Sequence, residues 1–378
     1  MNIGLVCYAS VGGSGIVATE LGKGLARRGH QVHVISTDSP FRLGDFQAGL
    51  RFHQVLTPSY PLFREPQYLL SLANRIVQVS REFQLDIVHA HYAIPHATAG
   101  FLARQVLDGA TPRGRPRVVT TLHGTDITLV GSDPSYSEIV AFSIEQSDGV
   151  TAVSNNLRES TYEQLGVTRD IRVIPNFVDC DEHRRMQVPE LRRRFVGDDP
   201  EAKVVIHVSN FRPVKRVPAV IEIFDRVRRA VPARLVLGGD GPELSLAQRQ
   251  VRELGIGSLV HVVGEQEAVL PLLSAADVFL LPSAEESFGL AALEATACNV
   301  PVVASRVGGL PEVIEDGVSG LLHPPGALDD MAASVIALLR DEPRRLRMGL
   351  EARRIAQERF DATRVIAMYE AYYAEALA

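Results

Sequence analysis

Short runs of β-branched and other apolar residues alternate along the chain with longer stretches whose apolar residues recur at a helical spacing. In the first half, the apolar runs lie at residues 3–7, 32–36, 86–90, 117–121, 149–153 and 171–174. Stretches with helical spacing lie between them at 15–28, 67–83, 97–107, 136–146 and 155–165. A short apolar run predicts a buried strand, and strands that alternate with helices form parallel sheets. The first half is therefore predicted to be a parallel α/β domain.

The same alternation begins again at residue 204. Apolar runs at 204–209, 234–237, 259–263, 278–281 and 302–304 alternate with helical stretches such as 217–230 and 244–254. A single open sheet would need about eleven strands, which is more than such sheets usually hold. We therefore expect two doubly wound, Rossmann-like domains, residues 1–174 and 175–359, that meet at an extended segment beginning with Pro175. The helical stretch 360–378 is expected to return to the first domain.

Composition narrows the class of protein. The chain has 378 residues, of which 46% are hydrophobic and 22% charged, and a formal net charge of −6. This balance is typical of globular proteins and gives no sign of a surface for nucleic acid or anionic lipid. The cysteines Cys7, Cys180 and Cys298 are far apart and match neither a disulfide framework nor a CxxC site. No apolar run approaches the ~18 residues of a membrane helix, so we expect a cytoplasmic protein without a membrane partner.

Three glycines, Gly12, Gly13 and Gly15, follow the first predicted strand. Glycines there let a ligand approach the backbone, and the N–H groups at a helix start favour an anion. The segment from Gly13 to Ala18 also fits the dinucleotide fingerprint G-x-G-x-x-A, with Asp38 about 20 residues further on. An NAD-dependent oxidoreductase is therefore one hypothesis, and a tight turn without a ligand is another. A Walker-type phosphate loop is excluded because no Lys-Ser or Lys-Thr pair follows.

Two glutamates, Glu286 and Glu294, frame a predicted helix start in the second half. Glu286 follows a predicted strand, at the edge where open α/β sheets bind their ligands. Glu294 lies within the helix, where a carboxylate can accept hydrogen bonds from two neighbouring hydroxyls such as those of a ribose. The N–H groups of Phe288, Gly289 and Leu290 at the helix start suit phosphate or sugar oxygens. The alternative is a pair of solvated surface glutamates.

A basic loop follows the first predicted strand of the second half. It reads Ser-Asn-Phe-Arg-Pro-Val-Lys-Arg over residues 209–216 and contains Arg212 and Lys215. Arginine and lysine between a strand and a helix are well placed to bind a diphosphate. A basic loop is by itself often only solvated. Here the loop shares one sheet edge with the two glutamates, which favours a binding role.

Together these motifs resemble family 4 of the retaining glycosyltransferases. The resemblance covers essentially the whole chain and includes the two glutamates, the basic loop, and the glycine-rich segments 238–243 and 308–312. It implies the GT-B architecture, in which two Rossmann-like domains face each other across a cleft that holds the active site. The first domain would bind the acceptor and the second the UDP-sugar.

Further segments are similar to a subset of this family. They lie at residues 7–21, 40–43, 89–96 and 123–126. The enzymes in this subset transfer N-acetylglucosamine from UDP-N-acetylglucosamine to the hydroxyl of L-malate, in bacillithiol biosynthesis. The resemblance thus implies a hexosyltransferase with these two substrates; another acceptor within the same family is the alternative.

The resemblance also assigns roles to residues. Lys215 and Arg212 would bind the donor pyrophosphate, Glu294 the ribose, and Glu286 with the amides of residues 288–290 the transferred sugar. Many relatives carry an arginine where this chain has Asn210, so Arg212 is expected to take over that role beside it. His123 matches the family's active-site histidine. The predicted catalytic residues are His123, Glu286 and Lys215, and the predicted donor-binding residues are Gly15, Asn210, Arg212, Lys215, Glu286, Phe288, Gly289, Leu290 and Glu294.

The acceptor site is less defined by the sequence. Malate has two carboxylates, so the first domain should offer hydroxyls, a helix N-terminus or an arginine. The candidates are Ser14, Arg64, Tyr92, Thr125 and Asn155. Each of these residue types is also common in ordinary turns.

We expect no metal and no cofactor. The predicted strand-end loops contain no Asp-x-Asp, and His89, His91 and His96 have no carboxylate partner suited to a metal site. Cationic side chains and helix dipoles would take the place of a divalent ion. A bilobal nucleotide-sugar isomerase and a sugar-binding protein without catalysis are further alternatives. The sequence does not determine the oligomeric state, for which a homodimer is one option.

Overall fold

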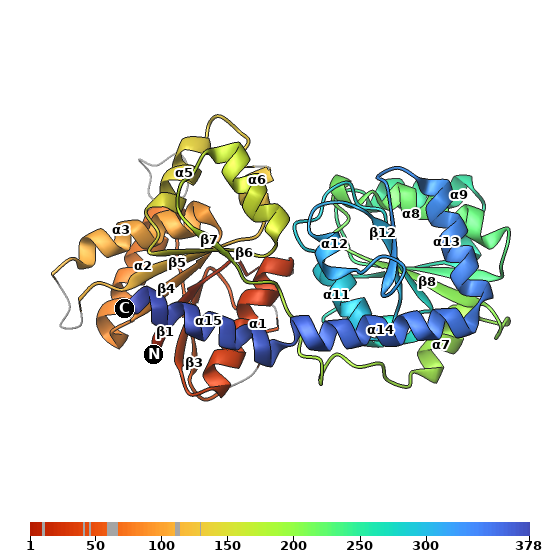
Figure 1. Ribbon diagram of the computed structural model, residues 1–378, viewed down its shortest axis with the longest axis horizontal. Helices are drawn as coiled ribbons and strands as arrows, with labels where there is room; N and C mark the ends of the chain where they lie inside the picture. Colours follow the sequence, from red (N-terminus) through yellow and green to blue (C-terminus); the bar gives the residue numbers. More distant parts are fainter. Residues whose placement is uncertain (10–11, 41, 45–46, 59–66, 110–113, 129) are drawn as a thin grey trace. The chain divides into compact units, whose positions relative to one another are not determined.

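The computed structural model describes residues 1–378 except 10–11, 41, 45–46, 59–66, 110–113 and 129 (Figure 1). The chain forms two compact units. One contains Met1–Asn176 together with Ala362–Ala378, and the other contains Phe177–Asp361. The C-terminal helix α15 (Ala362–Leu377) thus belongs to the same unit as the N-terminus.

Within the described part of the first unit, seven strands form one parallel sheet in the order β3-β2-β1-β4-β5-β6-β7. The strands are β1 (Asn2–Val6), β2 (Gln31–Ser36), β3 (Leu50–Gln54), β4 (Ile87–His91), β5 (Arg117–Leu122), β6 (Gly149–Ala152) and β7 (Ile171–Val173). The helices are α1 (Gly13–Arg27), α2 (Tyr68–Phe83), α3 (Thr98–Leu107), α4 (Thr125–Thr128), α5 (Ser137–Glu145) and α6 (Asn155–Leu165), with the π-helical turn η1 (Ala93–Ala97). This order is that of a doubly wound sheet.

The described part of the second unit repeats the arrangement with six parallel strands in the order β10-β9-β8-β11-β12-β13. The strands are β8 (Lys203–Val208), β9 (Ala233–Gly238), β10 (Val260–Gly264), β11 (Val278–Leu281), β12 (Val302–Ser305) and β13 (Gly320–His323). The α-helices are α7 (Pro189–Val196), α8 (Val217–Arg228), α9 (Leu244–Glu253), α10 (Leu270–Ala275), α11 (Leu290–Ala297), α12 (Leu310–Val313), α13 (Leu328–Arg340) and α14 (Glu342–Phe360). Short 3-10 turns are η2 (Pro213–Lys215) and η3 (Gly257–Leu259). The predicted α/β class is confirmed.

Helices cover the two faces of each sheet because the strands carry apolar residues on both faces. In the first unit, Val6 and Ile35 lie in a core cluster with residues of α2 and α3. On the opposite face, Gly22 of α1 lies against Leu5, so closely that a Cβ at Gly22 would be 3.0 Å from Leu5 Cδ1. Alternate residues of a strand point to opposite faces, so these runs read as continuously apolar.

Two strands give no clear signal in the sequence. β3 has the sequence Leu-Arg-Phe-His-Gln, and Arg51, Phe52 and Gln54 are exposed. β13 is four residues long and begins with Gly320. Both strands lie at the edge of their sheet, where one side has no neighbouring strand to bury it. The edge strands β7 and β10 are nevertheless predicted by their apolar runs at 171–174 and 259–263. β3 and β13 are missed because each has only two apolar residues, too few to read as an apolar run.

An aspartate stands just before three of the parallel strands and aligns each with its neighbour. Its carboxylate accepts the backbone N–H of the neighbouring strand at 2.7–2.8 Å, and its own N–H donates to the carbonyl of that same residue at 2.7–2.8 Å. The pairs are Asp86 with Asn2, Asp148 with Val118, and Asp277 with Val204. These reciprocal bonds fix the register of β4 on β1, β6 on β5 and β11 on β8.

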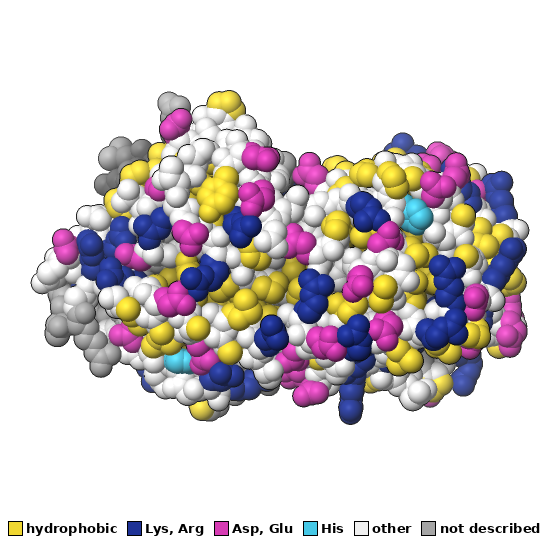
Figure 2. Space-filling model, in the orientation of Figure 1, with side chains coloured by type: hydrophobic (Ala, Val, Ile, Leu, Met, Phe, Trp, Pro, Cys, Tyr) yellow, Lys and Arg dark blue, Asp and Glu magenta, His cyan; other side chains and the backbone are white. Residues whose placement is uncertain are grey.

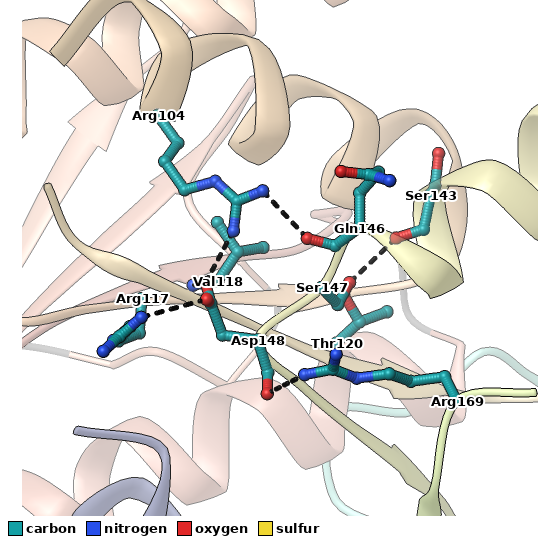
Figure 3. Close-up of polar contacts among 9 residues, drawn as sticks. All are labelled: Arg104, Arg117, Val118, Thr120, Ser143, Gln146, Ser147, Asp148 and Arg169. Atoms are coloured by element: carbon teal, nitrogen blue, oxygen red, sulfur yellow. Dashed lines mark hydrogen bonds and ion pairs between the residues drawn. The ribbon is translucent and has the colours of Figure 1, made fainter. Parts of the chain in front are cut away.

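Figure 3 shows the aspartate before β6 together with its arginine partners. Arg104 donates to Asp148 Oδ2 at 2.8 Å and to the Gln146 carbonyl at 3.0 Å. Arg117 reaches Asp148 Oδ1 at 3.4 Å, and Arg169 donates to the Asp148 carbonyl. Because the Arg104 side chain is only 8% exposed, its charge depends on this carboxylate for compensation.

Candidate functional site

The loops after β8 and β11 lie side by side at the carboxyl edge of the second sheet. β8 pairs directly with β11, although the paired residues Val205 and Val278 are 73 positions apart in sequence, and the strand order reverses between the two strands. Ligands of doubly wound sheets bind at such a reversal. The backbone N–H of Ala284 donates to the Val214 carbonyl at 2.7 Å and so ties the β11 loop to the turn that carries Lys215.

Lys215 and Glu286 form an ion pair at this position. Lys215 Nζ lies 2.6 Å from Glu286 Oε1, and Ser283 Oγ donates to the same oxygen at 3.0 Å. The Lys215 side chain is 19% exposed and that of Glu286 8%, so both are largely removed from water. The second carboxylate oxygen has a fixed direction because the first is held by two donors. The pair therefore presents one cation and one oriented acceptor.

Glycines from neighbouring segments pack closely against the backbone of the loops after β8 and β11. Gly239 has φ +123, and a Cβ there would lie 1.8 Å from the Ser209 carbonyl oxygen. Gly308 has φ +52, and a Cβ there would lie 1.8 Å from the Glu286 carbonyl oxygen. The glycine-rich segments of the second half thus act as backbone supports for the basic loop and for Glu286. The adjacent Gly309 N–H donates to the Glu286 carbonyl at 2.9 Å.

A buried histidine that sequence reasoning missed orders the start of the basic loop. His207 Nδ1 lies 2.9 Å from the Leu280 carbonyl, which can only accept, so Nδ1 carries the proton. Burial lowers the pKa of His207 to about 4, so at neutral pH Nε2 is an acceptor for Ser209 Oγ at 2.8 Å. Ser209 Oγ in turn accepts the Phe211 N–H at 3.3 Å. A histidine and a serine two residues apart at the end of a predicted strand are the sequence signal that could have indicated this hydrogen-bonded pair.

Glu294 lies one turn inside α11, whose N-cap Gly289 has φ +96. Glu294 is 5% exposed, and its Oε1 lies 3.9 Å from Nε2 of His183. Arg353 of α14 donates to the carbonyls of Cys180, His183 and Ala297 and thereby holds the segment with His183 against the end of α11. His183 is thus a neighbour of the Glu294 carboxylate that the sequence did not indicate.

The remaining predicted donor-binding residues differ in their exposure to solvent. Phe288 and Gly289 are buried, and the Phe288 ring packs edge-on against Phe360 at 5.6 Å. Asn210 is exposed, and Arg212 is partly exposed and forms no ion pair with the residues that the structure describes. All of them lie in the loops after β8 and β11. Leu290 is the first residue of α11.

In the first unit, Ser14, Tyr92 and His123 come together at the carboxyl ends of β1, β4 and β5, which are neighbours in the sheet. The Tyr92 hydroxyl donates to Ser14 Oγ at 2.7 Å, and the Tyr92 ring lies 5.2 Å from that of His123. Thr125 begins α4 immediately after β5. Asn155 is further away, because it begins α6 after β6 and is exposed.

The structure places Gly15 inside a helix and not on a loop. Gly15 is buried within α1, and its N–H already donates to the Gly12 carbonyl at 3.0 Å, so it lies behind the loop surface. Arg64 lies outside the described residues.

Asp126 organises the loop after β5, a role that sequence reasoning missed. Its carboxylate accepts N–H groups of Gly124 at 3.0 Å, Ala93 at 3.2 Å and His123 at 3.3 Å. The residue is 2% exposed, and burial raises its pKa to about 6. The three bonds connect the β4 and β5 loops and hold the backbone of His123.

Comparison with known proteins shows what this arrangement belongs to. Two family models match, "Glycosyltransferase Family 4" over residues 11–182 and "Glycosyl transferases group 1" over residues 190–355. The chain is 44% identical over 377 residues to N-acetyl-alpha-D-glucosaminyl L-malate synthase of Bacillus anthracis, covering 100% of this chain and 97% of that protein. The chain belongs to the family 4 glycosyltransferases.

A more distant relative is named for a different sugar donor. The GDP-mannose-dependent alpha-(1-6)-phosphatidylinositol monomannoside mannosyltransferase of Mycolicibacterium smegmatis is 31% identical over 78% of each chain. The structure of Anabaena Alr3699/HepE in complex with UDP and glucose superposes with a TM-score of 0.81 at 21% identity, covering 99% of both chains. This similarity confirms the predicted GT-B fold. The family assignment argues against the oxidoreductase and isomerase alternatives.

The described residues contain no helix long and apolar enough to cross a membrane. They also contain no cluster of three or more histidine, cysteine or acidic residues that could hold a metal ion. On the face shown in Figure 2, basic and acidic side chains are interspersed among hydrophobic ones.

Proposed function

We propose that this glycosyltransferase transfers N-acetylglucosamine from UDP-N-acetylglucosamine to the hydroxyl of L-malate, with retention of the anomeric configuration. The observation that carries the proposal is the 44% identity, over essentially the full length of both chains, to an enzyme named for that product. The ion pair of Lys215 and Glu286 at the strand-order reversal supports the donor half of the proposal.

The donor roles follow from the chemistry of the loops. Lys215 and Arg212 supply cations for the pyrophosphate, and the N–H groups at the start of α11 add hydrogen bonds. Glu294, a buried carboxylate one turn inside that helix, accepts the ribose hydroxyls. Glu286 has one oxygen held by Lys215 and Ser283 and offers the other to a sugar hydroxyl.

The transfer proceeds with attack on the same face as the leaving group. The malate oxygen forms a bond to the anomeric carbon as the bond between that carbon and the phosphate oxygen breaks. UDP leaves with the electron pair, and its phosphate oxygen takes the hydroxyl proton. Lys215 and Arg212 stabilise the charge on UDP. Asp126, the buried acid of the β5 loop, is engaged by three backbone N–H groups and does not serve as nucleophile.

Acceptor binding is assigned to the first unit. Ser14, Tyr92 and Thr125 offer hydroxyls at the sheet edge, Asn155 an amide, and Arg64 a cation for one malate carboxylate. We propose that no metal and no cofactor takes part. We also expect action in the cytoplasm, without membrane or nucleic acid, and a homodimer is the oligomeric state to test by light scattering.

The test is an incubation of pure protein with UDP-N-acetylglucosamine and L-malate, D-malate, citrate, lactate or glycerate, with product detected by mass spectrometry. Transfer to L-malate with α-configuration by proton NMR, unchanged by EDTA, is expected. A second arm offers GDP-mannose, because a relative uses that donor. Turnover with GDP-mannose alone would replace the donor assignment. Binding of UDP-N-acetylglucosamine with no turnover would instead support a binding protein.

A further inference from the structure

His91, the last residue of β4, contacts the candidate catalytic residue His123 from inside the protein. His91 is fully buried, and its Nδ1 lies 2.9 Å from His123 Nε2. The planes of the two rings are nearly parallel, with an angle of 21° between them and centroids 5.1 Å apart. His123 is partly exposed, and the hydrogen bond to His91 engages its inward-facing nitrogen. The pair therefore connects the partly exposed His123 to the buried end of strand β4.

Both imidazoles are neutral at neutral pH. Burial lowers the pKa of His123 to about 3. Burial, together with the neighbouring His89, His123 and His96, lowers the pKa of His91 well below its usual value. A hydrogen bond between two neutral imidazoles contains one proton, so one ring donates and the other accepts.

The other nitrogen of His91 decides which ring donates. His91 Nε2 is buried and has no hydrogen-bond partner among the described residues. If His123 donated, the proton of His91 would sit on Nε2, as a buried N–H without an acceptor. If His91 donates from Nδ1, only a lone pair is left without a partner. Buried N–H groups without acceptors are the rarer case in proteins.

We propose that His91 is a positioning residue that holds His123 in its Nδ1–H tautomer. His123 then presents an N–H donor to the reactants and is not a base. The tautomer follows from the contacts of the free protein; its effect on catalysis rests on the proposed glycosyl transfer. This assignment agrees with a reaction in which a phosphate oxygen of the donor takes the acceptor proton.

The direct test is ¹⁵N NMR of histidine-labelled free protein, with the His123 signals assigned by their loss in His123→Asn. A protonated Nδ1 and an unprotonated Nε2 at pH 7.5 are expected. An Nε2–H tautomer, or averaging between both, would overturn the proposal. This measurement needs no turnover. Activity with an Nε2–H tautomer would refute the inference alone, whereas the Nδ1–H tautomer in a protein inactive with malate would refute the proposed function alone.

Two variants at residue 91 separate positioning from packing. His91→Asn keeps an N–H that can donate to His123 Nε2, so the tautomer and most of kcat should be retained. His91→Leu removes the donor and should lower kcat about 100-fold, the low end for loss of one preorganised donor, with the KM for UDP-N-acetylglucosamine within about twofold. Equal kcat in the two variants, or an Nδ1–H tautomer in His91→Leu, would show that His91 does not position His123. If His91→Leu does not fold, His91→Asn and the wild-type spectrum still decide.

Discussion

Lys215 is one of only three lysines in the chain, and it is the one that the fold brings to Glu286. Lys215→Ala should lower kcat by about 10²–10³-fold, because it removes a preorganised cation from the departing diphosphate. Steady-state kinetics with L-malate check this. Lys203→Ala is the matched control, since Lys203 lies at the opposite end of β8 and pairs with the exposed Glu342 at 3.7 Å. Near-normal kcat in Lys215→Ala would contradict the assignment.

Glu294 tests the ribose assignment separately from the chemistry. Charge-assisted hydrogen bonds contribute about 1.5–3 kcal/mol each, and the ribose is remote from the reacting carbon. Glu294→Ala should therefore raise the donor KM strongly and change the malate KM little, with Glu294→Gln in between. The exposed Glu285→Ala is the control.

Comparison of UDP with 2′-deoxy-UDP as inhibitors checks the same contact. The wild-type protein should prefer UDP, and Glu294→Ala should lose most of this preference. Equal discrimination by both proteins would mean that another group binds the ribose.

At the scale of elements, the close approach of loops depends on single glycines. Gly308→Ala should weaken UDP binding and lower stability, because its Cβ would meet the Glu286 carbonyl oxygen at 1.8 Å. Gly317→Ala is the matched control, since Gly317 also has a positive φ, +80, but has no atom within 4 Å of the Cβ position. Urea unfolding of both variants measures the loss of stability, and UDP titration of both variants measures the loss of binding. An equal loss of UDP affinity would show that the loop support is unimportant.

The aspartate before β6 stabilises its element through strand register and arginine charge. Asp148→Ala leaves the largely buried Arg104 without its carboxylate and removes a bond to β5, so we expect a loss of about 3–5 kcal/mol in the free energy of unfolding. Urea unfolding measures it, with Asp329→Ala as control because the Asp329 side chain is 87% exposed. A loss no larger than in the control would mean that the sheet holds its register without this residue.

At the scale of the whole molecule, buried neutral histidines make stability depend on pH. Seven of the eleven histidines have a lowered pKa, chiefly because of burial; they are His33, His53, His89, His91, His96, His123 and His207. As pH falls below about 6.5, the unfolded chain takes up protons that the folded chain does not. Their contribution to stability is therefore complete above pH 6.5 and is lost toward pH 4. Asp126, whose pKa is raised to about 6, acts in the opposite direction.

Urea unfolding at pH 7.5, 6.0 and 5.0 should show a falling free energy of unfolding, by up to about 1.4 kcal/mol per pH unit for each histidine that titrates only on unfolding. His33→Gln should reduce this slope, since His33 has a pKa of about 4. A free energy that is flat between pH 7.5 and 5.0 would contradict the argument.

The order of strands and helices, the fold class and the motifs that identify the family can be read from short windows of sequence, because burial of a central strand and the spacing of a helix are local properties. β3 and β13 were missed because each has only two apolar residues, too few to form a recognisable run. Contacts between residues far apart in the sequence depend on the strand order, which cannot be read from a short window of sequence. Lys215 meets Glu286 across 71 residues, and His91 meets His123 across 32, because β8 lies beside β11 and β4 beside β5. The sequence thus determined which groups are available for chemistry, and the tertiary structure decided which of them touch.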